Sequence, residues 1–188
     1  MTDLLLDSLR RRVRAMHSLY DDAVDTMDLE GVNHVERDEV LPIAFSLFHF
    51  ANMEDTAFVL VTGQDPVWDG FWAERLQLAI PDHGKHRPPA EMVAQRIGDY
   101  DAFTAYMRTV YARTEAWLAE LDPTELTRVV VGHPLPPPLA STYSARVAGP
   151  DGITLLDAVE CWIYQHGLRH MGEIEHARAL IGLQGMTS

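Results

Sequence analysis

Residues 154–181 carry the most regular helical pattern in the sequence, and this pattern restricts the fold more than any other feature. Thr154 and Asp157 match a capping box, in which the two side chains bind free backbone N–H groups at a helix start, and Gly182 suits the helix end. Apolar and histidine side chains recur between them every three or four residues: Leu155, Val159, Trp162, Ile163, His166, His170, Ile174, Ala177 and Ile181. The sequence therefore predicts a long helix with two histidines on its buried face.

Three earlier segments show the same periodicity. They span residues 2–28, 39–61 and 90–121, and each is long enough to cross a small domain as a helix. Together with residues 154–181 they predict an all-α fold, a four-helix bundle with long connections. A chain of 188 residues fits one domain on length alone, so we expect residues 1–188 to form a single helical-bundle domain.

The second of these segments differs from the others in being apolar nearly all round over residues 41–50, which is typical of a buried helix. Pro42 fits the first turn of a helix that begins near Glu39, because the N–H that proline lacks has no partner there. Gly63 fits the C-terminal cap. We therefore expect this helix at the centre of the bundle.

Two connections are long enough to have structure of their own. Residues 65–81 carry aromatic residues at near-helical spacing and predict a short helix, which either packs on the bundle or covers a pocket. Residues 124–152 form the longest irregular stretch, and a small β-hairpin there would pair 129–131 with 143–147. Residues 82–89 read as a loop because of their glycine and prolines.

Composition excludes several functional classes. A formal net charge of −13 argues against binding to nucleic-acid phosphates or to an anionic membrane surface. Cys161 is the only cysteine, which excludes an internal disulfide and a cysteine-rich zinc site. It also lies about 140° around the predicted helix from His166, so we do not expect it to ligate a metal or to act as nucleophile. With no signal pattern and no apolar run near 18 residues, we expect a cytoplasmic protein.

The histidine pair indicates a metal site. His166 and His170 are four residues apart, which places the two imidazoles about 40° apart on one helix face. Two such rings can bind one transition metal, and Glu173 lies on the same face. One helix cannot complete the coordination, and His49, in the apolar second helix, is the best candidate for a third ligand. The alternative is that His49 is a core residue with one hydrogen-bond partner.

The other histidines fit ordinary roles. His17 follows an apolar position of the first helix and is expected at the rim or the surface. His83 and His86 form an H-x-x-H pair in a predicted loop, and solvated side chains are the expectation for both.

Two segments resemble the DinB-like (damage-inducible) superfamily of bacterial metal-binding four-helix bundles. The first is Leu47-Phe48-His49-Phe50-Ala51-Asn52-Met53-Glu54-Asp55, which is similar to the histidine segment of that family's second helix. The second is His166-x-x-x-His170-Met171-Gly172-Glu173-Ile174, against a family pattern of H-x-x-x-H-R-G-Q. The resemblance covers nearly the whole chain in helix order, and it implies that His49, His166 and His170 are the three metal ligands. Met171 and Glu173 depart from the pattern, which changes the surroundings of the site but removes no ligand.

Three histidines with an open coordination position are typical of catalytic rather than structural zinc. Zinc, nickel and iron(II) all accept imidazole, and zinc is slightly preferred here. At the predicted metal site Glu173 has three possible roles: it orients a ligand imidazole, approaches the metal, or acts as a base. Trp162, one turn before His166, either lines a substrate pocket or belongs to the core.

Four functional hypotheses follow. The resemblance implies a metal-dependent S-transferase or isomerase that acts on a small molecule with a low-molecular-weight thiol, and it makes a homodimer plausible. The second hypothesis is a hydrolase that uses metal-bound water with Glu173 as base. The third is a non-enzymatic, stress-related metal-binding protein. The fourth is a set of core histidines without a metal.

Overall fold

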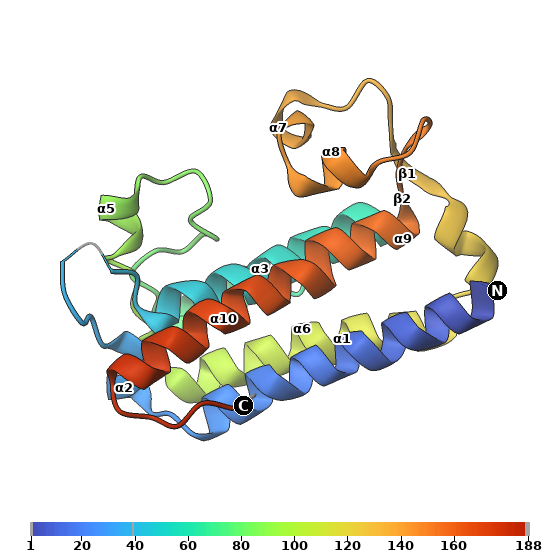
Figure 1. Cartoon of the computed structure of the whole chain (residues 1–188). Coiled ribbons are helices and arrows are strands. Elements are labelled where there is room, and N and C mark those ends of the chain that lie inside the picture. The colour runs from blue at the N-terminus through green and yellow to red at the C-terminus, as the bar shows by residue number, and fades with distance from the viewer. Residues whose placement is uncertain (1, 39, 187–188) are drawn as a thin grey trace.

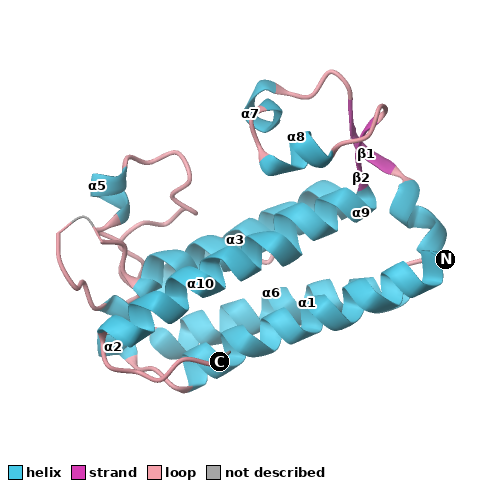
Figure 2. Ribbon diagram, viewed as in Figure 1, coloured by secondary structure: helices cyan, strands magenta, loops and turns pink. Residues whose placement is uncertain are grey.

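Four long helices form the body of the protein in the computed structural model, which describes residues 2–38 and 40–186 (Figure 1 and Figure 2). They are α1 (Thr2–Asp25), α3 (Ile43–Thr62), α6 (Tyr100–Glu120) and a last helix made of three consecutive segments, α9 (Leu155–Ala158), η2 (Val159–Tyr164) and α10 (Gln165–Leu180). Both α1 and α3 pack against α6 and against α10. The predicted all-α, four-helix bundle is therefore confirmed.

The bundle has one long crossover. Arg10 Nε donates to the backbone oxygen of Leu118 at 2.6 Å, and Tyr100 Oη donates to that of Val24 at 2.8 Å, so α1 and α6 are antiparallel. α3 and α10 are also antiparallel, whereas α1 runs parallel to α10. The resulting up-down-down-up order requires residues 63–99 to return along the whole bundle before α6 begins.

The first two long helices follow their sequence patterns closely. α1 buries the expected apolar residues from Leu9 to Val24, although Leu6 is buried in place of Leu5, and the short helix α2 (Leu29–Asn33) occupies the connection after it. α3 is buried on almost every side between residues 43 and 55, as expected. Gly63 ends it in the left-handed conformation, with φ of 72°, which confirms the predicted cap. Pro42 is the residue just before the helix rather than part of its first turn, and Glu39, the predicted start, lies outside the described residues.

A buried carboxylate anchors the crossover. Asp55 on α3 is 1% exposed and accepts hydrogen bonds from the backbone N–H groups of Val67 and Trp68, at 2.9 and 2.7 Å. It also forms an ion pair with Arg113 of α6. The predicted short helix is present as α4 (Gly70–Leu76), and it packs on α6.

The predicted start of the third long helix at residue 90 is wrong. Residues 94–98 instead run beside residues 76–80, where Gln95 exchanges two hydrogen bonds with the backbone of Ile80. Only the short α5 (Pro89–Met92) forms before this point. Asp99 then caps α6 by accepting from the N–H of Ala102 at 2.8 Å. The segment keeps helical spacing of apolar residues, but backbone hydrogen bonds to residues 76–80 fix its conformation.

The 124–152 connection contains a strand pair, as expected, but with a different partner. After the short 3₁₀ helix η1 (Pro123–Thr127), β1 (Val129–Gly132) pairs antiparallel with β2 (Gly152–Thr154). The predicted partner, residues 143–147, is instead the helix α8 (Tyr143–Val147), capped by Thr142 and preceded by α7 (Pro137–Ala140). Thr142 accepts from an N–H three residues on, which is a helix-start signal that the strand prediction overlooked.

The last helix begins with the predicted capping box between Thr154 and Asp157. Its middle, however, is a six-residue π-helical segment, η2, that no sequence pattern indicated. Among the described residues, no helix combines the length and the apolar character needed to cross a lipid bilayer.

The expectation that His17 lies at the rim or the surface is wrong. Its side chain is 2% exposed, because α1 packs against two helices at once and its buried face is wider than one stripe. His17 Nδ1 lies 2.8 Å from Oε1 of Glu115, and Nε2 lies 3.0 Å from Oε2 of Glu54. Its ring also stacks on Tyr111, with centroids 4.1 Å apart. Burial alone would lower the pKa of His17, but the two carboxylates outweigh burial and raise it to about 9.

This arrangement predicts that the protein loses stability at alkaline pH. The folded-state pKa of His17 lies above the ordinary value of 6.5, so its contribution is complete below about pH 6.5 and is lost as pH rises through about 9. The difference between the two values corresponds to at most about 3 kcal/mol. Urea unfolding is monitored by circular dichroism. His17→Gln should lower the free energy of unfolding near neutral pH, and this free energy should then fall less steeply above neutral pH than in the wild type. His34→Gln, at an exposed position, should keep the wild-type decline, and an equally steep decline in His17→Gln would contradict the assignment.

Candidate metal centre

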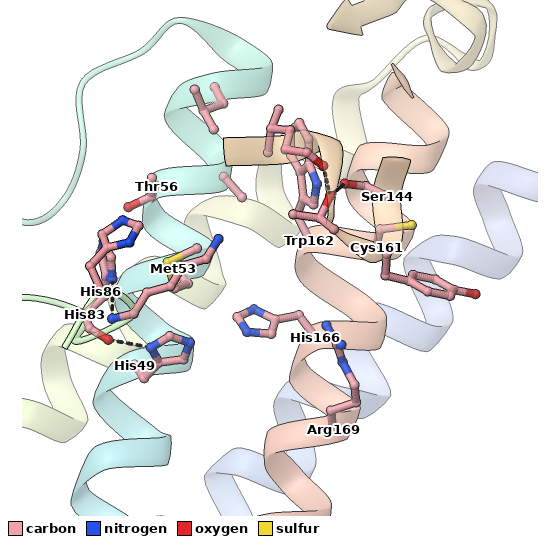
Figure 3. Close-up of a pocket in the computed structure, with 16 residues that line it drawn as sticks. His49, Met53, Thr56, His83, His86, Ser144, Cys161, Trp162, His166 and Arg169 are labelled. Carbon is pink, nitrogen blue, oxygen red and sulfur yellow. Dashed lines mark hydrogen bonds between the residues drawn. The ribbon is translucent and has the colours of Figure 1, made fainter. Parts of the chain in front are cut away.

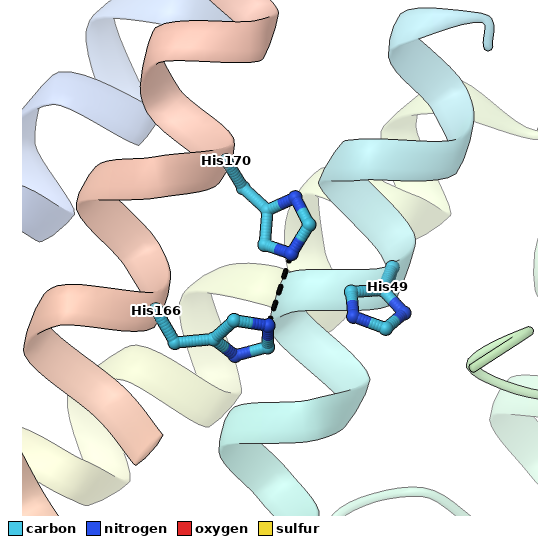
Figure 4. Close-up of side chains that lie close together, drawn as sticks. All are labelled: His49, His166 and His170. Carbon is cyan, nitrogen blue, oxygen red and sulfur yellow. Dashed lines mark hydrogen bonds between the residues drawn. The ribbon is translucent and has the colours of Figure 1, made fainter. Parts of the chain in front are cut away.

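Three histidines from two antiparallel helices meet between α3 and α10 (Figure 4). His49 comes from α3, and His166 and His170 are one turn apart on α10. One ring nitrogen of each lies within 4.8 Å of the others, and the Nε2 atoms of His166 and His170 are 2.9 Å apart. The structure therefore brings together the three residues that the sequence proposed as ligands.

Hydrogen bonds to the outer nitrogens orient two of the rings. Nδ1 of His49 lies 2.5 Å from the backbone oxygen of His83, and Nδ1 of His170 lies 2.7 Å from Oε2 of Glu173. Both partners accept, so both Nδ1 atoms carry the proton, and in the neutral rings each Nε2 keeps a free lone pair. The lone pairs of His49 and His170 are therefore available for an ion.

Two of the rings, those of His49 and His166, are kept neutral by their surroundings. Burial, together with the nearby charges of His170, His49, Arg169 and Lys85, lowers the pKa of His166 to about 3. Burial likewise lowers the pKa of His49 to about 4, although the His83 carbonyl opposes this. At neutral pH both residues are unprotonated, which is the state that a metal ligand needs.

The donors fit a divalent transition-metal ion. Three neutral imidazoles suit zinc, nickel or iron(II). In a tetrahedral site with bonds of about 2.0–2.1 Å the ligand nitrogens are about 3.3–3.4 Å apart, so the most widely separated pair of the cluster closes on an ion with a shift of up to about 1.5 Å. The facing Nε2 atoms of His166 and His170 also repel unless a proton or a cation lies between them. The residues present thus match the expected metal.

Gly167 has no side chain, which allows α10 to pack closely against Met16 of α1 and Phe50 of α3. A Cβ there would come within 2.1 Å of Met16 Sδ and 2.6 Å of a Phe50 ring atom, and both neighbours are buried. Tyr20 Oη donates to the Gly167 carbonyl at 2.9 Å, which joins α1 to the turn between the two histidines. The lack of a side chain at Gly167 therefore leaves the space that the side chains of Met16 and Phe50 occupy against α10.

Glu173 is placed as an orienting residue. Besides His170, its Oε2 accepts a hydrogen bond from Ser46 Oγ of α3 at 3.1 Å, so the carboxylate links the two helices. The hydrogen bond from His170 lowers the pKa of Glu173, which keeps it ionised at neutral pH. Of the three roles considered for this residue, these contacts support the first.

A cavity of about 450 Å³ adjoins the cluster (Figure 3). His49 and His166 both line it, so a molecule in the cavity can approach the point where the rings meet. The remaining lining comes from the middle of α3, the loop at residues 82–89, the α7–α8 segment, the turn before His166, where Trp162 is part of the wall, and Arg169 after it. The volume is in the range of small-molecule sites.

The π-helical turn changes the position of Cys161. In a straight α-helix this residue would face away from His166, but the N–H of Gln165 bonds to the oxygen of Glu160, five residues back. Residues five apart then share a face, so Cys161 lines the same cavity as His166. Its thiol is not among the donor atoms of the metal cluster, and burial raises its pKa to about 11.

Sequence reasoning missed which connections build the site. Within the described residues, none of the cavity lining comes from 65–81, the segment considered as a cover, because Trp68 and Trp72 pack on Tyr106 instead. The loop at 82–89 supplies the carbonyl that orients His49, a contact for which the sequence carries no signal. The 124–152 connection supplies another wall, and its unusual length was the one indication of a role.

Comparisons with known proteins agree with this architecture. A model described as the DinB superfamily matches residues 12–174. A crystal structure of a conserved protein from Enterococcus faecalis is similar over 94% of this chain and 96% of that one, with a TM-score of 0.73 and 17% sequence identity. At that identity the likeness shows the fold alone. No curated protein matches the sequence.

Glycine substitutions on α10 test the close packing. Gly167→Ala should lower the unfolding free energy by about 1–3 kcal/mol, because the added methyl has no room against Met16 and Phe50. Gly172→Ala, in the same helix with open space around it, should instead stabilise by up to about 1 kcal/mol. Chemical denaturation of both variants measures this, and a neutral Gly167→Ala would show that the contact is not close.

Substitution of Glu173 tests its orienting role. Glu173→Gln should weaken zinc affinity by about 10- to 100-fold while one ion still binds at saturation, because the charge that fixes the His170 ring is lost. Ser46→Ala keeps the carboxylate on His170 and should have a smaller effect. Competition titration with a chromogenic chelator gives the affinities, and equal affinity in Glu173→Gln and the wild type would remove this role.

Proposed function

The chain belongs to the DinB superfamily, and we propose that it is a metalloenzyme in which His49, His166 and His170 hold one divalent ion, zinc by preference over nickel or iron(II). The proposed reaction is transfer of a low-molecular-weight thiol to an electrophilic small molecule, or a thiol-dependent isomerisation of it. The observation that carries this proposal is the convergence of three imidazoles beside a cavity large enough for a small molecule.

The fixed positions of the ligands support a site that works on a bound molecule. A divalent ion there supplies positive charge that favours the deprotonated form of a thiol or water that binds it. The protein holds the rings ready for the ion: the His83 carbonyl orients His49, and Glu173 orients His170. Trp162 forms part of an apolar wall that limits water around the reacting molecule.

The sulfur nucleophile of this proposal comes from outside the chain. Cys161 is the only cysteine, and burial raises the pKa of its thiol to about 11, so it stays protonated at neutral pH. A small thiol that enters the cavity would lie against His49 and His166, which border it. Thiol transfer is preferred to hydrolysis because Glu173, the candidate base for a hydrolase, is hydrogen-bonded to His170 and Ser46 and is not among the described residues that line the cavity.

The proposal predicts that metal binding and activity depend on the same three residues. Wild-type protein should bind one zinc ion and catalyse conjugation of small thiols with electrophiles. The reaction is measured as the loss of free thiol. Replacement of His166 by Ala should abolish both metal binding and turnover while the protein remains helical. His83→Ala is the matched control, because His83 lines the cavity but contacts His49 through its backbone oxygen, which the variant keeps.

Two outcomes would contradict the proposal. Full metal stoichiometry in His166→Ala would show that the ion binds elsewhere. A metal-loaded wild type that turns over esters or amides without thiol would favour hydrolysis, and one that turns over nothing across a broad set of thiols and electrophiles would favour a non-enzymatic metal-binding role.

A further inference from the structure

The charge of the cavity is opposite to the charge of the chain. The sequence has 28 acidic residues against 15 basic ones, and a net charge of −13 repels anions from the protein as a whole. Yet the charged side chains in the cavity lining are Arg169 and Lys85, and among the described residues no Asp or Glu lines it. Lys85 is also the only lysine in the chain.

Arg169 and Lys85 are available to a ligand. Within the described part of the chain, neither forms an ion pair, whereas most other arginines do so or bind backbone oxygens. The contrast is clear inside one loop, where Arg87 lies 2.6 Å from Asp82 and 3.0 Å from Glu91. The loop thus neutralises one of its cations and leaves Lys85 free at the cavity.

Both cations have exposed side chains and lie near the histidine cluster. Arg169 is three residues after His166, on the same side of α10, and Figure 3 shows its side chain running along the helix beside that histidine. Lys85 lies in the loop that orients His49, and its backbone N–H donates to His83 Nδ1 at 3.1 Å. Gly84 permits this turn, with φ of +72° and no room for a Cβ beside Phe45. The two cations thus come from opposite walls of one cavity.

The rest of the lining is largely apolar. Met53 and Leu60 of α3, Leu139 of α7 and Trp162 contribute hydrocarbon and aromatic surface. A ligand that satisfies the whole cavity must therefore combine an anionic group with an apolar body. A neutral apolar ligand would leave two cations without a partner, and a small inorganic anion would leave the apolar wall in contact with water.

We infer that the cavity binds a small organic acid, with its carboxylate between Arg169 and Lys85 and its apolar part against Trp162. This inference rests on the proposed function and deepens it, since it assigns a chemical class to the molecule that meets the metal site. Arg169 contributes a planar pair of donors that matches a carboxylate, and Lys85 adds a second charge from the facing wall. The two residues select the substrate and take no part in holding the metal.

The test compares acids with their neutral amides. A panel of aryl and alkyl carboxylates that includes phenylacetate, with the matched amides, is titrated into metal-free and zinc-loaded wild type by calorimetry. The ¹⁵N-labelled indole resonance of Trp162, assigned with Trp162→Phe, reports occupancy of the cavity. At least one acid should bind about tenfold or more tightly than its amide in both forms, and added salt should reduce the difference.

Variants assign the preference to the two cations. Arg169→Gln and Lys85→Gln should each weaken the preferred acid several-fold, leave its amide unchanged and retain one zinc ion per chain. Arg146→Gln is the control, because Arg146 is an exposed arginine of α8 that is not part of the cavity lining. Equal binding of acids and amides, an acid preference that survives the double variant, or no binding of any acid at millimolar concentration would overturn the inference.

The same measurements separate this inference from the proposed function. If zinc fails to bind but the acid preference and its loss in Arg169→Gln remain, the metal proposal fails and the acid site stands. If one zinc ion binds and acids have no advantage over amides in either form, the metal proposal stands and the acid site fails. An advantage that exists only with zinc would place the carboxylate on the ion and would also overturn the role given to Arg169 and Lys85.

Discussion

The antiparallel packing of α3 against α10 is the interaction on which the rest of the structure depends. It places His49 opposite the two histidines that one turn of α10 aligns, and at Gly167 the side chains of Met16 and Phe50 leave no space for a further side chain. Imidazoles in such an interior are costly unless their polar atoms have partners. Here the Nδ1 atoms of His49 and His170 have partners within the protein, and one nitrogen of each of the three rings faces the other two. An ion between these facing nitrogens would be their partner.

The supports of the site come from segments far apart in the sequence. A backbone oxygen in the loop at 82–89 orients His49, and the same loop brings Lys85 to the cavity. Glu173 connects His170 to Ser46 and so ties the two helices together beside the cluster. Elsewhere in the bundle, the buried His17 and Glu54 and the half-buried Glu115 join α1, α3 and α6. The charged groups that join α1, α3 and α6 are therefore different from the one that orients His170.

Periodicity predicted the parts of the structure that follow from one helix at a time. The four long helices, the capping box at Thr154, the glycine cap at Gly63 and the inward direction of His166 and His170 all depend on local spacing, and the structure has them. His49 was found because the histidine pair on the last helix needs a third ligand and because its segment resembles a known family. What failed depended on tertiary contacts. Residues 94–98 keep helical spacing but pair with the crossover, and β1 pairs with β2 rather than with residues 143–147. The π-turn that moves Cys161 to the cavity, and the carbonyl that orients His49, left no mark in the sequence.

The most direct measurement of the central claim is an anomalous difference map from crystals of the protein grown with zinc and measured at the zinc edge. The account predicts one strong peak between the Nε2 atoms of His49 and His170 and the ring of His166, with a free side toward the cavity. A peak on His83 and His86, or a histidine cluster without a peak in zinc-saturated crystals, would contradict it.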